Sequence, residues 1–251
     1  MMRIRCPLSR STLPMRWLSL LLCLGASLAL SIADGAQALI TATGGAAVQI
    51  GAPANSRVGM LQSNTSIFVW EEKQNHLTVN VLPFNIDGTP GFYDTAASVA
   101  ATAGNLPANS PVDSHMIHFD QLGPGTTTLS GSVEFQHPIT AVFVLCDPLD
   151  GSDTELGSPV TLYPNCIGTG DFRPVDWVST GDTEQIIISP DRMKIDFTLR
   201  TSNVLDQLRV VTQQSAAVAA APGLGFPAVA LLVLLGIALG TRILQKNGLP
   251  V

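Results

Sequence analysis

The chain has 251 residues, of which 46% are hydrophobic and 13% are charged, and its formal net charge is −6 at pH 7. Within residues 39–213 there are seven basic residues against eighteen acidic ones, so this part is more acidic than the whole. Such a balance argues against binding to nucleic acid or to anionic lipid surfaces, because phosphate binding needs lysine and arginine to displace counterions. We therefore predict no nucleic-acid partner.

The N-terminus has the pattern of a secretory signal peptide. Arginines precede an unbroken apolar run over residues 17–32, and the triplet AQA follows, ending at Ala38. These are the charged, apolar and cleavage regions of an exported precursor. We predict that residues 1–38 are the leader and that cleavage occurs between Ala38 and Leu39.

Residues 39–213 form a segment long enough for one domain with a sizeable core. It contains short β-rich runs, some with alternating polarity, separated by clusters of Gly, Pro, Asn and Asp. The runs are 66–70, 77–84, 116–119, 126–135, 139–145, 185–189, 193–199 and 207–212. This spacing predicts an all-β fold, an antiparallel β-sandwich of jelly-roll-like type.

Two segments carry more specific expectations. The run ITAVFVL at residues 139–145 is apolar at every position but one, which is typical of a strand in the middle of a sheet. The alanine-rich segment 92–105 offers Asp94 as an N-cap and Gly104 as a terminator, so it is either a short helix or a loop.

Cys146 and Cys166 are the two cysteines that remain once the leader is removed. Disulfides persist in the compartments that exported proteins enter. We predict that this pair closes a loop at the rim of the sandwich, which contributes about 3 kcal/mol in the chain-entropy model.

Acidic residues are concentrated just after the first of these cysteines. Asp147, Asp150, Asp153 and Glu155 lie within ten positions, and calcium prefers several oxygen ligands. A calcium site is therefore one interpretation. The other is a loop whose Asp, Gly and Ser residues shape turns by binding local backbone N–H groups.

Recognisable catalytic motifs are absent from the sequence. His115 and His118 form an HxxH pair, but in a strand these positions point to opposite faces, which disfavours a shared metal. There is no GxSxG, HExxH or Walker loop. We predict a protein that is not an enzyme, with a hydrolase built from dispersed carboxylates as the less favoured alternative.

The C-terminus has the pattern of a membrane anchor. We expect a low-complexity tether at 214–225, a transmembrane helix at 226–244 and a short tail at 245–251. Pro222 and Pro227 mark the break before the apolar segment. Arg242 and Lys246 follow that segment and place the tail in the cytoplasm, with the domain outside.

Four segments, taken in order, resemble one class of exported bacterial proteins. They are SHMIHFDQLG, LSGSVEFQHPITAVFVL, LDGSDTELGSPVTLYP and LDQLRVVT, and together they cover roughly residues 64–212. Their pattern is similar to the ectodomains of PEP-CTERM-type proteins, which are sorted by exosortases. The ends of the chain are similar too, although APGLGFP at 221–227 stands in place of Pro-Glu-Pro.

The resemblance implies a surface or extracellular-matrix protein of a Gram-negative bacterium, with a structural or binding role near exopolysaccharide. An exosortase-like enzyme is then an expected partner. Two alternatives stay open for the C-terminus: cleavage by a sorting enzyme with another recognition motif, or retention as a single-pass anchor. A calcium-dependent carbohydrate- or protein-binding module is the alternative function.

Overall fold

The computed structural model describes residues 39–166, 171–175, 177, 183–202 and 204–214. The described part is mostly strand, with two short helices. The elements are β1 (Ile40–Gly45), β2 (Ala47–Gln49), β3 (Ile67–Leu77), β4 (Leu82–Phe84), β5 (Gly91–Tyr93), α2 (Ala96–Ala100), β6 (Gly104–Leu106), β7 (Pro111–Asp120), β8 (Thr127–Phe135), β9 (Ile139–Phe143), α3 (Cys146–Leu156), β10 (Gln185–Ile188), β11 (Lys194–Thr201) and β12 (Leu205–Gln213).

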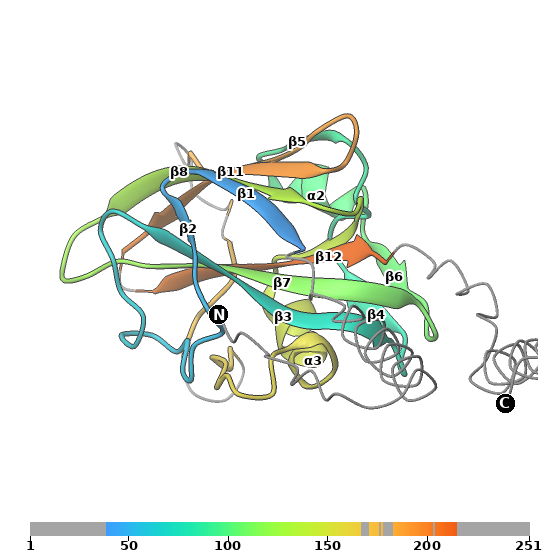
Figure 1. Cartoon of the computed structure of the whole chain (residues 1–251). Coiled ribbons are helices and arrows are strands. Elements are labelled where there is room, and N and C mark those ends of the chain that lie inside the picture. The colour runs from blue at the N-terminus through green and yellow to red at the C-terminus, as the bar shows by residue number, and fades with distance from the viewer. Residues whose placement is uncertain (1–38, 167–170, 176, 178–182, 203, 215–251) are drawn as a thin grey trace, which may run out of the picture. The chain divides into compact units, whose positions relative to one another are not determined.

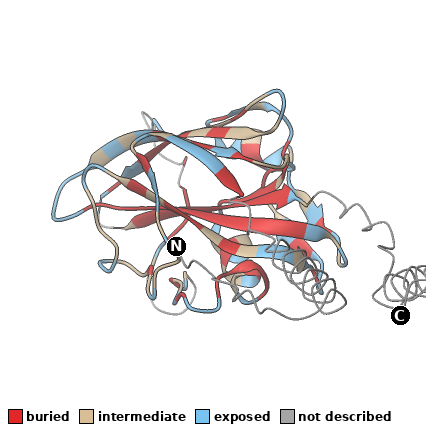
Figure 2. Cartoon of the chain, in the orientation of Figure 1, coloured by how far each residue is buried: buried red, intermediate tan, exposed pale blue. Residues whose placement is uncertain are grey.

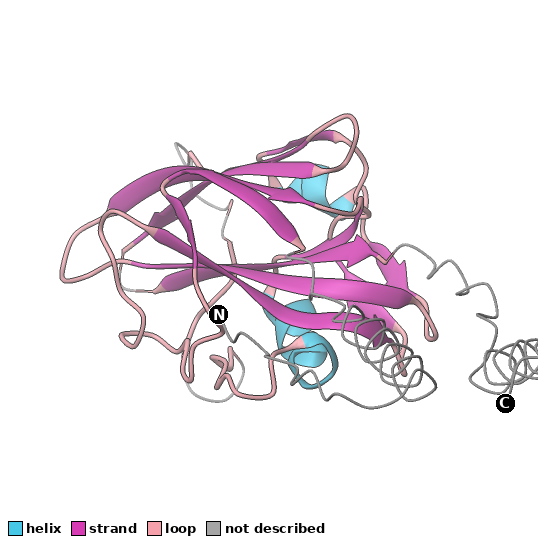
Figure 3. Ribbon diagram, viewed as in Figure 1, coloured by secondary structure: helices cyan, strands magenta, loops and turns pink. Residues whose placement is uncertain are grey.

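The strands form two five-stranded sheets and one small pair (Figures 1 and 3). The first sheet has the order β1-β8-β11-β10-β5, and the second has the order β2-β3-β7-β12-β9. The small pair is β4-β6. The all-β prediction is thus confirmed. The second sheet is mixed rather than purely antiparallel, because β2 runs parallel to β3.

The main hydrophobic core lies between the two five-stranded sheets. Both sheets contribute to it, for example Val133 and Phe197 from the first and Ile117 and Val210 from the second. These residues are buried, and much of the ribbon of both sheets is coloured as buried (Figure 2). Burial of apolar side chains on facing sheets is what stabilises such a layered arrangement.

A second hydrophobic cluster covers the outer face of the second sheet. Leu149 and Leu156 of α3 pack there with Phe143 of β9 and Val211 of β12, and β4 and β6 extend the same cluster. As a result β7 and β12 are buried on both faces along almost their whole length (Figure 2). The outer face therefore belongs to the interior of the domain.

The expectation that ITAVFVL is a central strand is wrong. It forms β9, which lies at the end of the second sheet. Its side chains are apolar on both faces because Val142 enters the main core while Phe143 enters the second cluster. The free edge of β9 is covered by residues 85 and 86, whose backbone bonds to Val142.

The two helices also differ from expectation. The segment 92–105 contains α2, but the N-cap is Thr95 in a capping box with Ser98, not Asp94, and Gly104 begins β6. Residues 146–156, expected to be a loop, form the helix α3. Gly and Pro within α3 disfavour a helix in isolation, so packing against the second sheet decides its structure.

The expected strand 77–84 is interrupted. β3 ends at Leu77, and Val79 and Val81 are exposed before β4 begins at Leu82. Thr78 is buried and donates to the carbonyl of Pro107, which turns the chain toward the β4-β6 pair. The other expected strands are present with shifted ends, whereas the short strands β1, β2, β5 and β6 were not predicted.

No helix in the described ranges is both long and apolar enough to cross a membrane. The predicted leader at 1–38, the tether from residue 215 and the membrane segment at 226–244 lie outside those ranges. The same holds for the anchor residues Pro222, Pro227, Arg242 and Lys246.

We predict that Asn85→Ala destabilises the domain by about 2–4 kcal/mol, because it leaves two backbone donors without their acceptor. The Asn85 side-chain oxygen accepts from the N–H groups of Val144 and Leu145 at 2.8 and 3.0 Å, and Asn85 is buried. Urea unfolding measures the change. Asn105→Ala, at an exposed position of β6, is the control, and an equal effect of both substitutions contradicts the prediction.

Candidate functional site

A cluster of charged side chains lies between α3 and the outer face of the second sheet. At its centre Arg209 of β12 forms a bidentate pair with Glu72 of β3, with Nε–Oε2 at 2.7 Å and Nη2–Oε1 at 2.9 Å. Both side chains are fully buried. Arg209 also binds Ser152 and Asp153 of α3, the latter at 2.8 Å. One guanidinium thus joins β12, β3 and α3.

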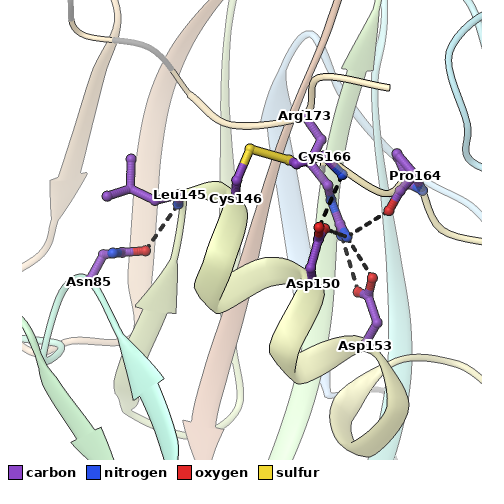
Figure 4. The surroundings of a disulfide bond; sticks show 8 residues. All are labelled: Asn85, Leu145, Cys146, Asp150, Asp153, Pro164, Cys166 and Arg173. Atoms are coloured by element: carbon purple, nitrogen blue, oxygen red, sulfur yellow. Dashed lines mark hydrogen bonds and ion pairs between the residues drawn. A yellow bond between two sulfur atoms is a disulfide. The ribbon is translucent and has the colours of Figure 1, made fainter. Parts of the chain in front are cut away.

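A second arginine completes the cluster from the segment that follows the disulfide. Arg173 donates from Nη1 to Asp150 at 3.1 Å and to Asp153 at 2.5 Å, and it also binds the carbonyl of Pro164 (Figure 4). Its side chain is fully buried, while the two aspartates keep small exposed fractions. Asp153 is therefore shared by both arginines.

Tyr163 lies against both guanidinium groups. The guanidinium carbons of Arg173 and Arg209 are 5.7 and 5.4 Å from its ring centroid. Its hydroxyl donates to Glu72 at 2.5 Å and accepts from the N–H of Ser158. We call Glu72, Asp150, Asp153, Tyr163, Arg173 and Arg209 the arginine cluster.

The electrostatic interactions within the cluster keep Arg209 charged and Tyr163 neutral. Burial disfavours the charged form of Arg209, but the adjacent Glu72 carboxylate outweighs this and raises the pKa of Arg209. Burial and the same carboxylate raise the pKa of Tyr163. The tyrosine therefore stays a neutral donor, and the arginine stays a cation, over the whole physiological range.

The predicted disulfide between Cys146 and Cys166 is confirmed, with the two Cα atoms 5.7 Å apart (Figure 4). It joins the first residue of α3 to the chain that leads to Arg173. The N–H of Cys166 donates to Asp150 at 3.0 Å, so the disulfide and the arginine cluster share a residue. The bond therefore joins the start of a helix to the segment that leads to Arg173. The prediction that it closes a loop at the rim of the sandwich is wrong, because residues 146–156 are helical.

The predicted calcium ligands do not form one set. Asp150 and Asp153 bind Arg173, whereas Glu155 accepts from the backbone of Val79 and Asn80 and from the Asn80 side chain. Asp147 lies in the first turn of α3. Within the part of the chain that the structure describes, no group of three or more His, Cys, Asp or Glu is placed to hold a metal.

His115 and His118 lie on β7 and have different surroundings. The ring of His115 packs on Phe135 of the first sheet at 4.8 Å, so it belongs to the main core. His118 contacts the Gln207 side chain at 2.9 Å and the carbonyl of Leu61 at 3.0 Å. Burial lowers the pKa of His115 to about 3 and that of His118 to about 4, so both are neutral at pH 7.

A hollow of about 450 Å³ opens beside the arginine cluster and is lined in part by Lys73, Asp150, Asp153 and Tyr163. Each carboxylate here already has an arginine partner, and Lys73 donates to the carbonyl of Glu155. The polar groups therefore bind one another, which indicates a structural role for the hollow's polar lining.

Sequence reasoning missed four residues of the cluster: Glu72, Tyr163, Arg173 and Arg209. Two of them did carry a signal. Arg209 lies inside the apolar strand LDQLRVVT and Glu72 follows the apolar run IFVW, and a charge within such a strand indicates a buried partner. Nothing in the sequence shows which opposite charge that partner is.

Comparison of the chain with protein-family models, with curated proteins and with solved structures finds no match.

We predict that Arg209→Ala destabilises the domain by about 3–5 kcal/mol, because it leaves the buried Glu72 carboxylate without its counter-ion. Chemical denaturation measures the loss. The matched control is Arg200→Ala on β11, where the side chain is exposed and a change within about 0.5 kcal/mol is expected. Equal effects of the two substitutions would show that the cluster does not stabilise the fold.

We also predict that stability falls as the pH drops from about 6.5 to 4. In the unfolded chain His118 takes up a proton below about pH 6.5, whereas in the folded chain it does so only below about pH 4. Protonation therefore favours the unfolded state, and His118 alone lowers the free energy of unfolding by about 3 kcal/mol over that window. His118→Gln should reduce this dependence in urea unfolding measured at several pH values, and His115, whose folded pKa is about 3, accounts for part of what remains. An unchanged slope contradicts the assignment.

Proposed function

We propose that the protein is an exported β-domain, held at the surface of a bacterium, with a structural or binding role and no catalytic activity. The observation that supports this best is the disulfide between Cys146 and Cys166. Such bonds persist in oxidising compartments outside the cytoplasm and are rare within it. The signal-peptide pattern that ends at Ala38 independently predicts the same compartment.

The arrangement of the acidic residues favours a structural role for the disulfide-closed segment. Asp150 and Asp153 bind Arg173, Asp153 also binds Arg209 of β12, and Glu155 binds backbone N–H groups that follow β3, so these side chains hold α3 on the second sheet. A calcium-dependent binding module would need carboxylates directed at a common point. Among the described residues, these carboxylates instead bind arginine and backbone N–H groups.

The proposed tether and anchor follow from the sequence of residues 214–251 and from the resemblance to PEP-CTERM-type proteins. The membrane is then the first partner, through the apolar segment 226–244. An exosortase-like enzyme acts on the motif near Pro222 and Pro227, and exopolysaccharide surrounds the mature domain. We also propose that the two five-stranded sheets belong to a β-sandwich of jelly-roll-like type.

Export is tested in spheroplasts of a Gram-negative host that expresses the full chain. We expect added protease to digest the domain without lysis, and a thiol reagent to label Cys146 and Cys166 only after reduction. The double variant Cys146→Ser/Cys166→Ser gives the background of labelling. Protection from protease until lysis, together with free thiols, would contradict the proposal. Mass spectrometry of the C-terminus then distinguishes a retained anchor from a cleaved one.

A further inference from the structure

Leu39 lies at an unusual position for the first residue after a predicted cleavage site. Its backbone N is 2.8 Å from Oε1 of Glu71, and the N of Ile40 is 3.2 Å from the same oxygen. The carbonyl of Leu39 accepts from the N–H of Gln136 at 2.8 Å. Only 8% of Leu39 is exposed. The residue is therefore held at both of its backbone polar groups.

The strand that follows Leu39 makes this position rigid. β1 pairs with β8 from Ile40 onward, where Ile40 lies opposite Phe135. Glu71 comes from β3 of the second sheet, so the contact joins the start of the domain to the opposite sheet. The Glu71 carboxylate therefore accepts two successive backbone N–H groups at the start of β1 through charge-assisted hydrogen bonds.

We infer that Glu71 is the binding site for the α-ammonium group of the mature chain, which begins at Leu39. This inference rests on the proposed export, because cleavage after Ala38 converts the Leu39 amide into a charged amine. The amide offers one donor to Glu71. The ammonium offers three donors and a positive charge at the same atom, and hydrogen bonds between ionised partners are about twice as strong as neutral ones.

The charged groups around this site favour a cation. Asp113 of β7 is close enough to interact electrostatically with Glu71 and with His137, which follows β8. The other oxygen of Glu71 accepts from the side chain of Gln74 at 2.5 Å. Glu71 is the carboxylate at the position of the amine, and His115 of β7 lies directly opposite Glu71 in the strand pairing. Measurements at pH 7.5 and above avoid the range in which histidines ordinarily titrate.

The consequence is a pH-dependent contribution to stability. Glu71 raises the pKa of the α-amino group above the value of about 7.7–8.0 that such groups ordinarily have. A base with a raised pKa stabilises the folded state fully below its unfolded value, and the stabilisation is lost as the pH rises through the folded value. The gain is therefore present near pH 7 and absent near pH 10.

The test compares four proteins, each ending at Val251 and purified in detergent. Two begin at Leu39, released from a fusion that leaves no extra residue, with Glu71 or with Glu71→Gln. Two retain residues 36–38, with the same pair at position 71. The added residues move the ammonium to about a Debye length from Glu71 at physiological ionic strength, while the Leu39 amide keeps its hydrogen bond.

We expect the α-amine of the Leu39 form to titrate about one unit above its ordinary value, read from the pH dependence of acetylation by mass spectrometry. Glu71→Gln should remove this shift. The same substitution should lower the melting temperature of the Leu39 form more than that of the extended form at pH 7.5, and equally at pH 10. Two results overturn the inference. One is an α-amine with an ordinary pKa, and the other is a loss of melting temperature that is the same for the Leu39 form and the extended form at pH 7.5 as well as at pH 10.

N-terminal sequencing of the exported protein separates this inference from the proposed function. A mature chain that begins at Leu39 supports both. A mature chain that begins elsewhere overturns the role of Glu71 while export stands. An uncleaved chain that spheroplast protease cannot reach refutes the two together.

Discussion

The buried pair between Arg209 and Glu72 is the interaction on which the rest of the domain depends. A guanidinium without solvent needs every donor satisfied, and among the described residues of the second sheet the side chain that binds Arg209 is Glu72. Ser152, Asp153 and the carbonyl of Leu149, all in α3, supply the remaining acceptors. The outer face of the sheet must therefore be covered by α3, and the strands β7 and β12 become interior on both faces.

The disulfide and Arg173 further stabilise the packing of α3 on the second sheet. Glu72 and Arg209 are separated by 137 positions in the chain, so bringing them together costs considerable chain entropy. Cys146 and Cys166 close the segment that carries α3 and Tyr163, which reduces the freedom of the unfolded chain. Arg173 then forms ion pairs with the two aspartates that face the cluster. Charge, covalent closure and packing therefore stabilise the same layer.

Much of the strand pattern was predictable, because alternating polarity and turn residues are local features. The order of the strands was not. ITAVFVL appeared central since it is apolar on both faces, but it is an edge strand covered on one side by α3 and at its edge by Asn85. SHMIHFDQ and LDQLRVVT contain polar residues and yet are the most deeply buried strands. Their polar side chains find partners across the sheet, such as His118 with Gln207.

The sequence by itself determined the all-β class, most of the strands and the pairing of Cys146 with Cys166. These follow from periodicity, turn chemistry and the count of cysteines, which need no knowledge of distant contacts. Only the tertiary structure decided that the acidic segment is a helix and that Asp150 and Asp153 neutralise Arg173. The physical reason is that a buried charge takes whichever opposite charge the fold brings near, and residues far apart in the chain supply it.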